Sequence, residues 1–316
     1  MMSLTWIPRP VADEAVTYLR EHGEVALGYG PGAVDYHAVA ARITGVLLRT
    51  AEFRRRDIDL APNLRIIARH GAGYDTVDVD AATERGIPVT IAGGANAGSV
   101  AEHVFALLFA VARNVTAADH AVREGGWTTA RAVLTGVELA GRTMGLLGCG
   151  RIGRRVALIA TALGMTVAAC DSALSDARGI RLTGQGELLR ESDVVSLHLP
   201  LYPSTAKIID RQALAALPNG AILINTARGG LIDEQALLDH LDNGHLAGAG
   251  LDVLATEPPR PDDPLVAHPR TVVSPHIGGQ THEAMRRVAM DAAESILAAY
   301  RGEIPANAVN VPAATR

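Results

Sequence analysis

The chain has 316 residues with 48% hydrophobic and 20% charged content, which predicts two globular domains and excludes intrinsic disorder. Its net charge of −5 provides no basic surface, so binding to nucleic acid or to an anionic membrane is not expected. Two cysteines without a signal-peptide pattern, and no apolar run long enough to span a bilayer, predict a cytoplasmic protein.

The first third of the chain alternates helical and strand-like segments. Residues 11–22 are predicted as a helix, and residues 42–49, 64–69 and 86–91 are predicted as short buried strands. Each strand ends near a glycine-rich turn such as HGAG or AGGANAG. This order predicts a small open α/β unit with a parallel sheet.

A long apolar helix is predicted next. Ser99 and Glu102 fit the S-x-x-E pattern of a capping box, which predicts the start of this helix. Its apolar residues lie nearly all round, so we expect both faces to be covered, by a second domain or by a partner chain.

A second, larger sheet follows. Apolar strands are predicted at residues 144–147, 166–169, 194–197, 221–225, 249–253 and 271–274, with short helices between them. The last segment, residues 281–300, is predicted as a helix. Its apolar stripe consists of Met285, Val288, Ala289, Ala292, Ile296 and Tyr300.

A glycine turn separates the first strand of the larger sheet from a helix. Gly148, Gly150 and Gly153 fit G-x-G-x-x-G, and Asp171 ends the next strand. In this setting the first glycine permits the tight turn, the second lets backbone approach a pyrophosphate, and the third lets helix pack on strand. Asp171 would bind the adenosine ribose and repel a 2′-phosphate, which favours NAD over NADP. The alternative is a turn that serves packing alone.

Three charged side chains follow three strands of the same predicted sheet. Arg228, Glu257 and His276 each come a few residues after an apolar strand and beside glycine or proline. Ligands bind at the carboxyl ends of the strands in such sheets, so we expect the three groups to converge there. An imidazole can exchange a hydroxyl proton during hydride transfer, a carboxylate can orient it, and an arginine can bind a substrate carboxylate. No metal is required; the other histidines are interpreted as structural.

These motifs together resemble the D-2-hydroxyacid dehydrogenase family, and phosphoglycerate dehydrogenases in particular. The resembling segments include ARHGAGYDTVDVDAATERGIPV, NAGSVAEHVFAL, GLLGCGRIGRRVA, HLPLYPSTAKII, NTARGGLIDEQAL, GLDVLATEP and SPHIGGQTHEA. The resemblance implies two Rossmann/flavodoxin-like domains with parallel sheets. Residues 1–98 and 283–316 would form the flavodoxin-like substrate-binding (catalytic) domain, with an NAD-binding Rossmann domain, residues 99–282, inserted into it. A homodimer through the NAD domains is also implied.

The resemblance assigns roles to individual residues. Arg228, Glu257 and His276 are implied as the catalytic set, with Arg228 also binding substrate. Substrate binding is further expected at Arg49, Arg69, Ala72, Gly73 and Asn96. NAD binding is expected at Gly148, Gly150, Arg151, Ile152, Gly153, Asp171, Leu199, Pro200, Thr205, Thr226, Ala227, Asp252, His276 and Gly278.

The resemblance leaves several substrates open. Arg49 and Arg69 lie where phosphoglycerate dehydrogenases use arginines, which favours 3-phosphoglycerate and 3-phosphohydroxypyruvate; hydroxypyruvate or glyoxylate is the alternative. Glu257 argues against the formate dehydrogenase branch, which pairs its histidine with an amide. A non-catalytic NAD(H)-sensing protein of the corepressor type is the alternative from another class. The chain end leads us to expect no appended regulatory domain.

Overall fold

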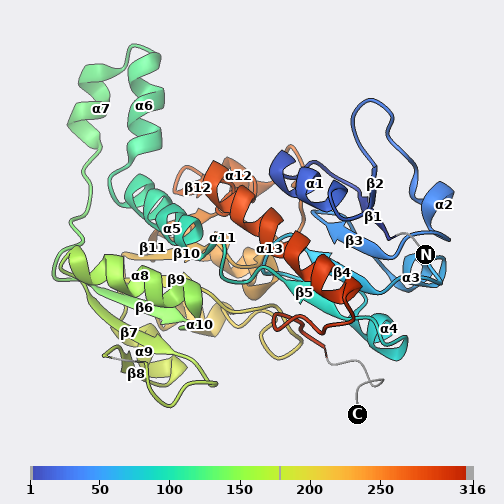
Figure 1. The fold of residues 1–316 in the computed structure, drawn as a ribbon. Helices are drawn as coiled ribbons and strands as arrows, with labels where there is room; N and C mark the ends of the chain where they lie inside the picture. Colours follow the sequence, from blue (N-terminus) through green and yellow to red (C-terminus); the bar gives the residue numbers. More distant parts are fainter. Residues whose placement is uncertain (1–2, 178, 311–316) are drawn as a thin grey trace. The chain divides into compact units, whose positions relative to one another are not determined.

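The computed structural model describes residues 3–177 and 179–310, which form two compact units (Figure 1). Unit 1 comprises Met1–Asn96 and Gln280–Arg316, and unit 2 comprises Ala97–Gly279. Each unit is built on an open sheet whose paired strands run parallel. The predicted α/β fold class, with one unit interrupting the other along the chain, is confirmed.

The sheet of unit 1 has five strands in the order β2-β1-β3-β4-β5. The strands are β1 (Leu4–Ile7), β2 (Glu24–Leu27), β3 (Gly45–Leu48), β4 (Ile66–Arg69) and β5 (Val89–Ile91). This order is that of flavodoxin-like sheets, in which the chain reverses direction of winding between the strands here labelled β1 and β3.

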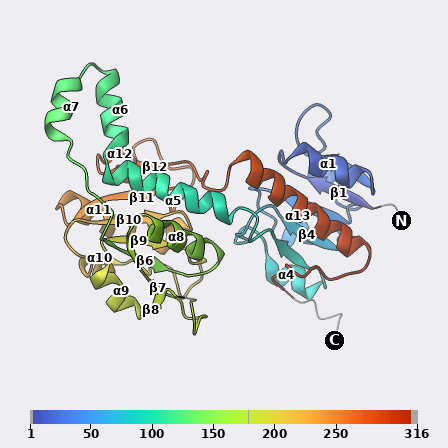
Figure 2. The same cartoon turned by 60° about the vertical axis from the view of Figure 1, so that its left-hand side comes forward.

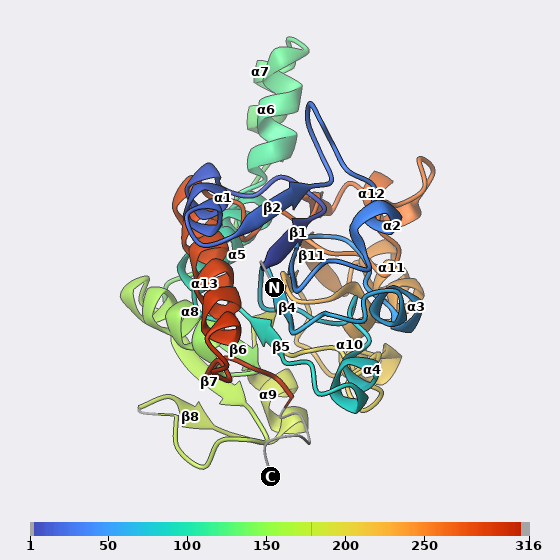
Figure 3. The same ribbon diagram turned by 45° about the vertical axis from the view of Figure 1, so that its right-hand side comes forward.

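Helices cover both faces of this sheet (Figure 3). One face carries α1 (Asp13–Arg20) and α13 (His282–Tyr300), and the other carries α2 (Tyr36–Val39), α3 (Arg55–Asp59) and α4 (Val79–Glu84). Strand residues alternate between the two cores, because successive side chains point to opposite faces: Val46 and Leu48 pack on one side and Leu47 on the other.

The last helix, α13, completes unit 1 from the far end of the chain. Thr281 caps it by accepting a hydrogen bond from the Ala284 amide. Val288, Ala289, Ala292 and Ile296 are buried, as the predicted stripe requires, while Met285 and Tyr300 are half-buried. The Tyr300 hydroxyl lies 2.7 Å from Thr5 Oγ1 on β1. Helix α13 therefore belongs to the core of unit 1, although it lies near the far end of the chain.

The sheet of unit 2 has seven strands in the order β12-β11-β10-β9-β6-β7-β8. The strands are β6 (Thr143–Leu147), β7 (Thr166–Cys170), β8 (Arg181–Leu182), β9 (Val194–Leu197), β10 (Ala221–Asn225), β11 (Leu246–Leu251) and β12 (Thr271–Val273). Counted from β6, the order is 3-2-1-4-5-6-7, the dinucleotide-binding arrangement, with its switch point between β6 and β9.

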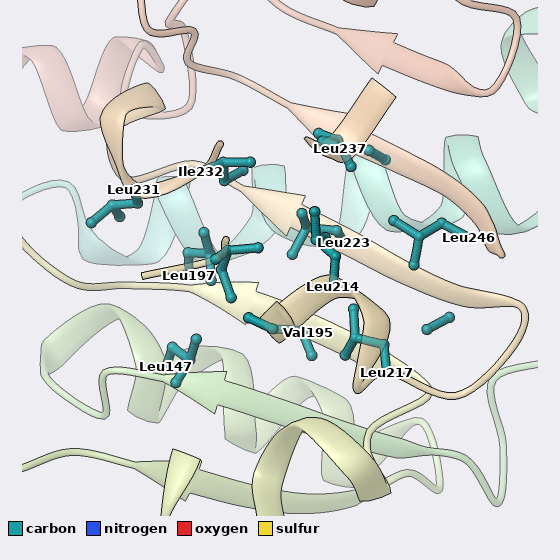
Figure 4. Close-up of a cluster of buried hydrophobic side chains, with 14 of the residues drawn as sticks. Leu147, Val195, Leu197, Leu214, Leu217, Leu223, Leu231, Ile232, Leu237 and Leu246 are labelled. Atoms are coloured by element: carbon teal, nitrogen blue, oxygen red, sulfur yellow. The ribbon is translucent and has the colours of Figure 1, made fainter. Parts of the chain in front are cut away.

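The helices of unit 2 pack on two cores. One core lies under α9 (Gln185–Glu191), α10 (Arg211–Ala215), α11 (Glu234–Asp242) and α12 (Pro264–Ala267), and Figure 4 shows its leucines, Leu197 and Leu223 among them. The other lies under α5 (Ala97–Ala112) and α8 (Arg151–Ala162). A short 3₁₀ turn, η1 (Gly229–Leu231), precedes α11.

Two further helices, α6 (Val115–Arg123) and α7 (Trp127–Val133), project from unit 2 as a hairpin (Figures 1 and 2). Helix α6 has no buried residue, and α7 has one, Ala130. Within the described residues no single helix is long and apolar enough to cross a membrane. The pair α5 and α6 meets that criterion only jointly, across a bend of 62°.

The predicted start of α5 is wrong. The helix begins at Ala97, so Ser99 lies inside it and is not an N-cap; a turn over residues 93–96 leads directly into the helix. One stripe of α5, formed by Glu102, Ala106 and Phe109, is exposed in the single chain, so its cover by a second domain or a partner chain stays a prediction. This stripe follows the i, i+4, i+7 spacing of one helix face.

Candidate active site

The site residues predicted in unit 2 lie at the carboxyl ends of its strands. The glycine turn follows β6, Asp171 follows β7, Arg228 follows β10, Asp252 and Glu257 follow β11, and His276 follows β12. All of these strands are parallel, so the segments emerge at one edge of the sheet.

The three glycines of the turn differ in the space around them. A Cβ on Gly148 would lie 2.7 Å from the His198 carbonyl oxygen, and one on Gly153 would lie 2.4 Å from the Gly148 carbonyl oxygen. Gly148 also has φ +95°, a conformation that favours glycine. A Cβ on Gly150, at the start of α8, would meet nothing within 4 Å. The outer glycines thus serve packing, while the middle one borders open space suited to a pyrophosphate.

Asp171 joins the glycine turn to the end of β7. One carboxylate oxygen accepts from the Cys149 amide at 2.8 Å and the other from the Ala173 amide at 2.9 Å. These bonds fix a half-buried carboxylate beside the turn. Its position fits the ribose of a dinucleotide whose phosphates lie at the N-terminus of α8.

The other residues predicted to bind NAD occupy the same edge. Thr226 Oγ1 is buried without a hydrogen-bond partner in the described structure, and such an orphaned hydroxyl suits a site that receives a polar ligand. Thr205 donates to the Pro200 carbonyl at 2.7 Å and so ties the loop after β9. The remaining members are the exposed Arg151 and Pro200, the half-buried Ile152, Leu199 and Ala227, and the buried Gly278.

Glu257 and His276 are in direct contact. Nδ1 of His276 lies 2.8 Å from Oε2 of Glu257, and the second carboxylate oxygen accepts from the Leu254 amide at 3.1 Å. Because an ionised carboxylate only accepts, Nδ1 carries the proton of this hydrogen bond. His276 adopts φ +55°, an uncommon conformation for a residue with a side chain.

The environment of Glu257 favours its charged form. Burial alone would raise the pKa of Glu257, but the hydrogen bond from His276, the Leu254 amide and the nearby Arg228 guanidinium together lower it. The carboxylate is therefore ionised at neutral pH. The structure thus brings a cation, a carboxylate and an imidazole to one place, as the strand-end argument predicted.

The loops that carry Arg228 and Glu257 are held by residues that the sequence did not single out. The buried Asn225, the last residue of β10, donates to the Arg228 carbonyl at 2.9 Å and accepts from the Ala227 amide at 3.0 Å. A Cβ on Gly229 would lie 1.9 Å from the Leu254 carbonyl carbon, so the two loops pack without space for a side chain. Glu234 accepts from the Ala255 amide at 2.7 Å. The sequence feature that could have indicated Asn225 is its place as a polar residue at the end of an apolar strand.

Asp252 is buried, with 2% of its surface exposed. Its carboxylate accepts from the Ile277 and Gly278 amides, and its carbonyl oxygen accepts from the His276 amide. Two side chains that the sequence did not indicate, His103 and Ser274, also contact it. Its direct contact with NAD stays a prediction.

The substrate-binding residues predicted in unit 1 lie at or after the ends of β3, β4 and β5. Arg49 donates to the Pro10 carbonyl at 2.5 Å, and Arg69 donates to the Leu48 carbonyl at 3.1 Å. Ala72 and Gly73 are half-buried in the turn after β4. The side-chain oxygen of Asn96 is buried without a partner among the described residues. Their contact with substrate stays a prediction.

No group of three histidine, cysteine or acidic side chains that could hold a metal ion occurs among the residues with described positions. The charged groups at the edge of unit 2 are engaged with one another and with backbone. The arrangement can bind an anion, hold a proton on an imidazole and accept a dinucleotide.

Comparison with known proteins gives consistent matches. The family model described as the NAD-binding domain of D-isomer specific 2-hydroxyacid dehydrogenases matches residues 105–278. A D-3-phosphoglycerate dehydrogenase of Mycobacterium tuberculosis is 44% identical over 306 residues, 95% of this chain; the chain spans 57% of that protein's length. A glyoxylate reductase of Korarchaeum cryptofilum is 38% identical over 98% of this chain and 96% of its own. The structure of the TT0316 protein from Thermus thermophilus matches with a TM-score of 0.89 and 39% identity, covering 97% of this chain and 100% of that one.

Proposed function

Because the chain belongs to the D-isomer specific 2-hydroxyacid dehydrogenase family, we propose that it is an NAD-dependent oxidoreductase that interconverts a D-2-hydroxy acid and its 2-keto acid. The observation that carries the proposal is the 2.8 Å contact between His276 Nδ1 and Glu257, with Arg228 close enough to lower the pKa of Glu257. Unit 2 is the proposed NAD-binding domain, and unit 1 is the proposed substrate-binding domain.

Each of the three side chains has one proposed role. His276 accepts the hydroxyl proton at Nε2 as the 2-hydroxy acid is oxidised, and returns it in the reverse direction. Glu257 accepts the hydrogen bond from Nδ1, which fixes the ring and stabilises the imidazolium. Arg228 binds the substrate carboxylate, which fixes the reacting carbon. When bound, the nicotinamide supplies the position that takes up or gives the hydride.

NAD is the proposed cofactor in preference to NADP. Asp171 places a carboxylate beside the glycine turn, held by the Cys149 and Ala173 amides. A second negative charge, such as a 2′-phosphate, would be repelled at this position. Turnover of a 2-keto acid measured with NADH and then with NADPH tests this preference, and equal turnover with the two would contradict it.

For the substrate, 3-phosphoglycerate with 3-phosphohydroxypyruvate is the first choice. The mycobacterial relative named above supports it, as do Arg49 and Arg69 at neighbouring strand ends, since arginine suits a phosphate. The archaeal glyoxylate reductase, which this chain matches along nearly its whole length, supports glyoxylate or hydroxypyruvate as the second choice.

One experiment separates these proposals. Purified protein receives NADH with equal concentrations of 3-phosphohydroxypyruvate, hydroxypyruvate, glyoxylate or pyruvate, and NADH consumption is measured. A strong preference for the phosphorylated acid supports the first choice, and a preference for hydroxypyruvate or glyoxylate supports the second. No turnover with any acid, together with tight NADH binding, would overturn the enzymatic proposal in favour of an NAD(H)-sensing protein.

The α6–α7 hairpin is the proposed contact with a second copy of the chain. Its exposed apolar residues are Val115, Val122, Trp127 and Val133, of which Trp127 and Val133 are 64% and 69% exposed. An apolar surface of this kind on a projecting element marks an interaction site.

A cytoplasmic location is proposed as well, since both cysteines are free thiols; cell fractionation tests it.

A further inference from the structure

A polar network centred on the buried Asp252 contacts the turn that carries His276. Nε2 of His103, on α5, lies 2.8 Å from the Ser274 hydroxyl and 3.2 Å from Oδ1 of Asp252. The Ser274 hydroxyl donates to the same Asp252 oxygen at 2.6 Å. The Nε2–H tautomer of His103 satisfies all of these contacts, because the serine oxygen and the carboxylate both accept.

Asp252 connects this network to the backbone of the turn. Its Oδ1 accepts from the Ile277 amide at 2.9 Å, its Oδ2 from the Gly278 amide at 2.8 Å, and its carbonyl oxygen from the His276 amide at 2.8 Å. These bonds span the three residues that include His276 at φ +55°. A left-handed residue with a side chain persists only where surrounding contacts determine its conformation.

The His103 ring also supports the turn by packing. A Cβ on Gly278 would lie 3.3 Å from Cδ2 of His103 and 2.9 Å from Oδ2 of Asp252, so the turn fits closely against both side chains. Burial alone would raise the pKa of Asp252, but hydrogen bonds from His103, Ser274 and the two amides lower it, so the carboxylate keeps the charge that holds the turn.

We propose that His103 is a positioning residue, which, through Asp252 and Ser274, fixes the backbone turn that presents His276. The inference rests on the proposed catalytic role of His276. Glu257 orients the imidazole ring, and the His103–Asp252–Ser274 network fixes the backbone of the turn that carries it. Loss of the His103 donor leaves Asp252 with fewer partners and loosens the turn.

Hydrogen exchange tests the structural part without any assay of activity. In His103→Phe, which keeps a ring but removes the donor, amides of residues 274–280 are expected to exchange faster than in the wild type. His103→Gln, whose amide nitrogen can donate at a similar distance, is expected to restore slow exchange. The control is His245→Phe: His245 is half-buried, contacts the Leu214 carbonyl and precedes β11 at the opposite edge of the sheet. Unchanged exchange in His103→Phe would overturn the proposal.

Kinetics test the functional part. His103→Phe is expected to lower kcat about 10- to 100-fold, since displacement of a reacting group by about 1 Å can cost that much, with the KM for NADH little changed. His103→Gln should recover most of kcat. In a His276→Ala background, His103→Phe should cause no further loss of the residual rate. An equal loss in both backgrounds would show that His103 does not act through His276.

The two proposals fail in different ways. A wild-type protein that turns over none of the tested acids would contradict the proposed function, and the exchange experiment would still decide whether His103 holds the turn. An active wild type whose His103→Phe variant retains full kcat would contradict the positioning role alone.

Discussion

At the scale of single residues, the proposed chemistry depends on the hydrogen bond between His276 and Glu257. His276→Ala removes the group assigned to proton exchange, and we expect kcat to fall about 10²- to 10⁴-fold while NADH binding persists. Glu257→Gln should cause a smaller loss. Initial rates and NADH titration by fluorescence measure both effects. Nearly full turnover by His276→Ala would contradict the assignment.

The loss in Glu257→Gln has an expected pH dependence. The pKa of Glu257 is lowered, so its carboxylate is ionised above the ordinary range of a glutamate and its support of His276 is present there. That support disappears only as pH falls through the lowered pKa. The ratio of wild-type to variant rates should therefore fall towards one only when the pH drops below the ordinary range of a glutamate, which initial rates over a series of acidic pH values measure.

His70 provides a prediction about stability. Burial, with smaller contributions from Arg49 and Arg69, lowers its pKa to about 4. The unfolded chain binds the proton below about pH 6.5 and the folded chain only below about 4, so stability falls as pH decreases between these values. From pH 7 to 5 the loss attributable to His70 is about 2 kcal/mol by this linkage.

His70→Gln removes this dependence, so the variant should lose about 2 kcal/mol less than the wild type over that pH interval. Denaturant unfolding at pH 7 and 5 measures the difference. In a Trp127→Phe background the remaining tryptophan, Trp6, reports on unit 1. His120→Gln, at an exposed histidine, is the control. If His70→Gln lost as much stability between pH 7 and pH 5 as the wild type, the prediction would be contradicted.

At the scale of elements, the glycine turn allows two substitutions of the same chemistry to be compared. Gly150→Ala enters open space at a negative φ, so the melting temperature should hardly change while the Kd for NADH rises. Gly153→Ala would place its methyl group 2.4 Å from the Gly148 carbonyl oxygen, so α8 must move and the melting temperature should fall.

Thermal unfolding and NADH titration of both variants check this. If Gly150→Ala bound NADH like the wild type, the open space beside Gly150 would not be the pyrophosphate site. If both variants lost stability equally, the packing distinction between the two glycines would be wrong.

The projecting hairpin carries a prediction about assembly. Trp127→Asp puts a charge on the exposed apolar face of α7, and we expect a dimer to become a monomer at micromolar concentration. Light scattering after gel filtration measures the mass. Leu60→Asp, at an exposed leucine of unit 1, should leave it unchanged. A Trp127→Asp variant that remains dimeric would place the contact elsewhere.

Elements whose apolar residues face the core of their own unit could be predicted from the sequence. Strands β3, β4, β6, β9 and β10 are mainly apolar and lie close to their predicted positions. Strand β2 was missed; it is a partly exposed edge strand with only three apolar residues. Strand β1 (Leu4–Ile7) was missed as well; it has four residues, one of them the polar Thr5. Helices α6 and α7 were missed because almost none of their side chains are buried within the chain.

The residues of the candidate site also differ in whether the sequence predicts their positions. The positions of Arg228, Glu257 and His276 were predictable because each lies within six residues of the end of a strand, so local sequence places it at the sheet edge. His103 and Ser274 were not, because the role of each arises from a contact between α5 and the end of β12, 171 residues apart. No local pattern encodes that pairing.

At the scale of the whole molecule, unit 1 consists of two distant segments of the chain. Ile7, Leu47, Ile66 and Ala68 form a core with residues of α1 and α13. The chain leaves unit 1 after Asn96 and returns to it at Gln280.

This order has a consequence during synthesis. The ribosome delivers every strand of unit 2 before it delivers α13, so unit 2 can fold on the nascent chain while unit 1 still lacks part of one layer. Until α13 emerges, part of the apolar face of β3 and β4 stays uncovered. Of the two units, unit 1 begins first along the chain but receives its last helix after all the strands of unit 2 have been made.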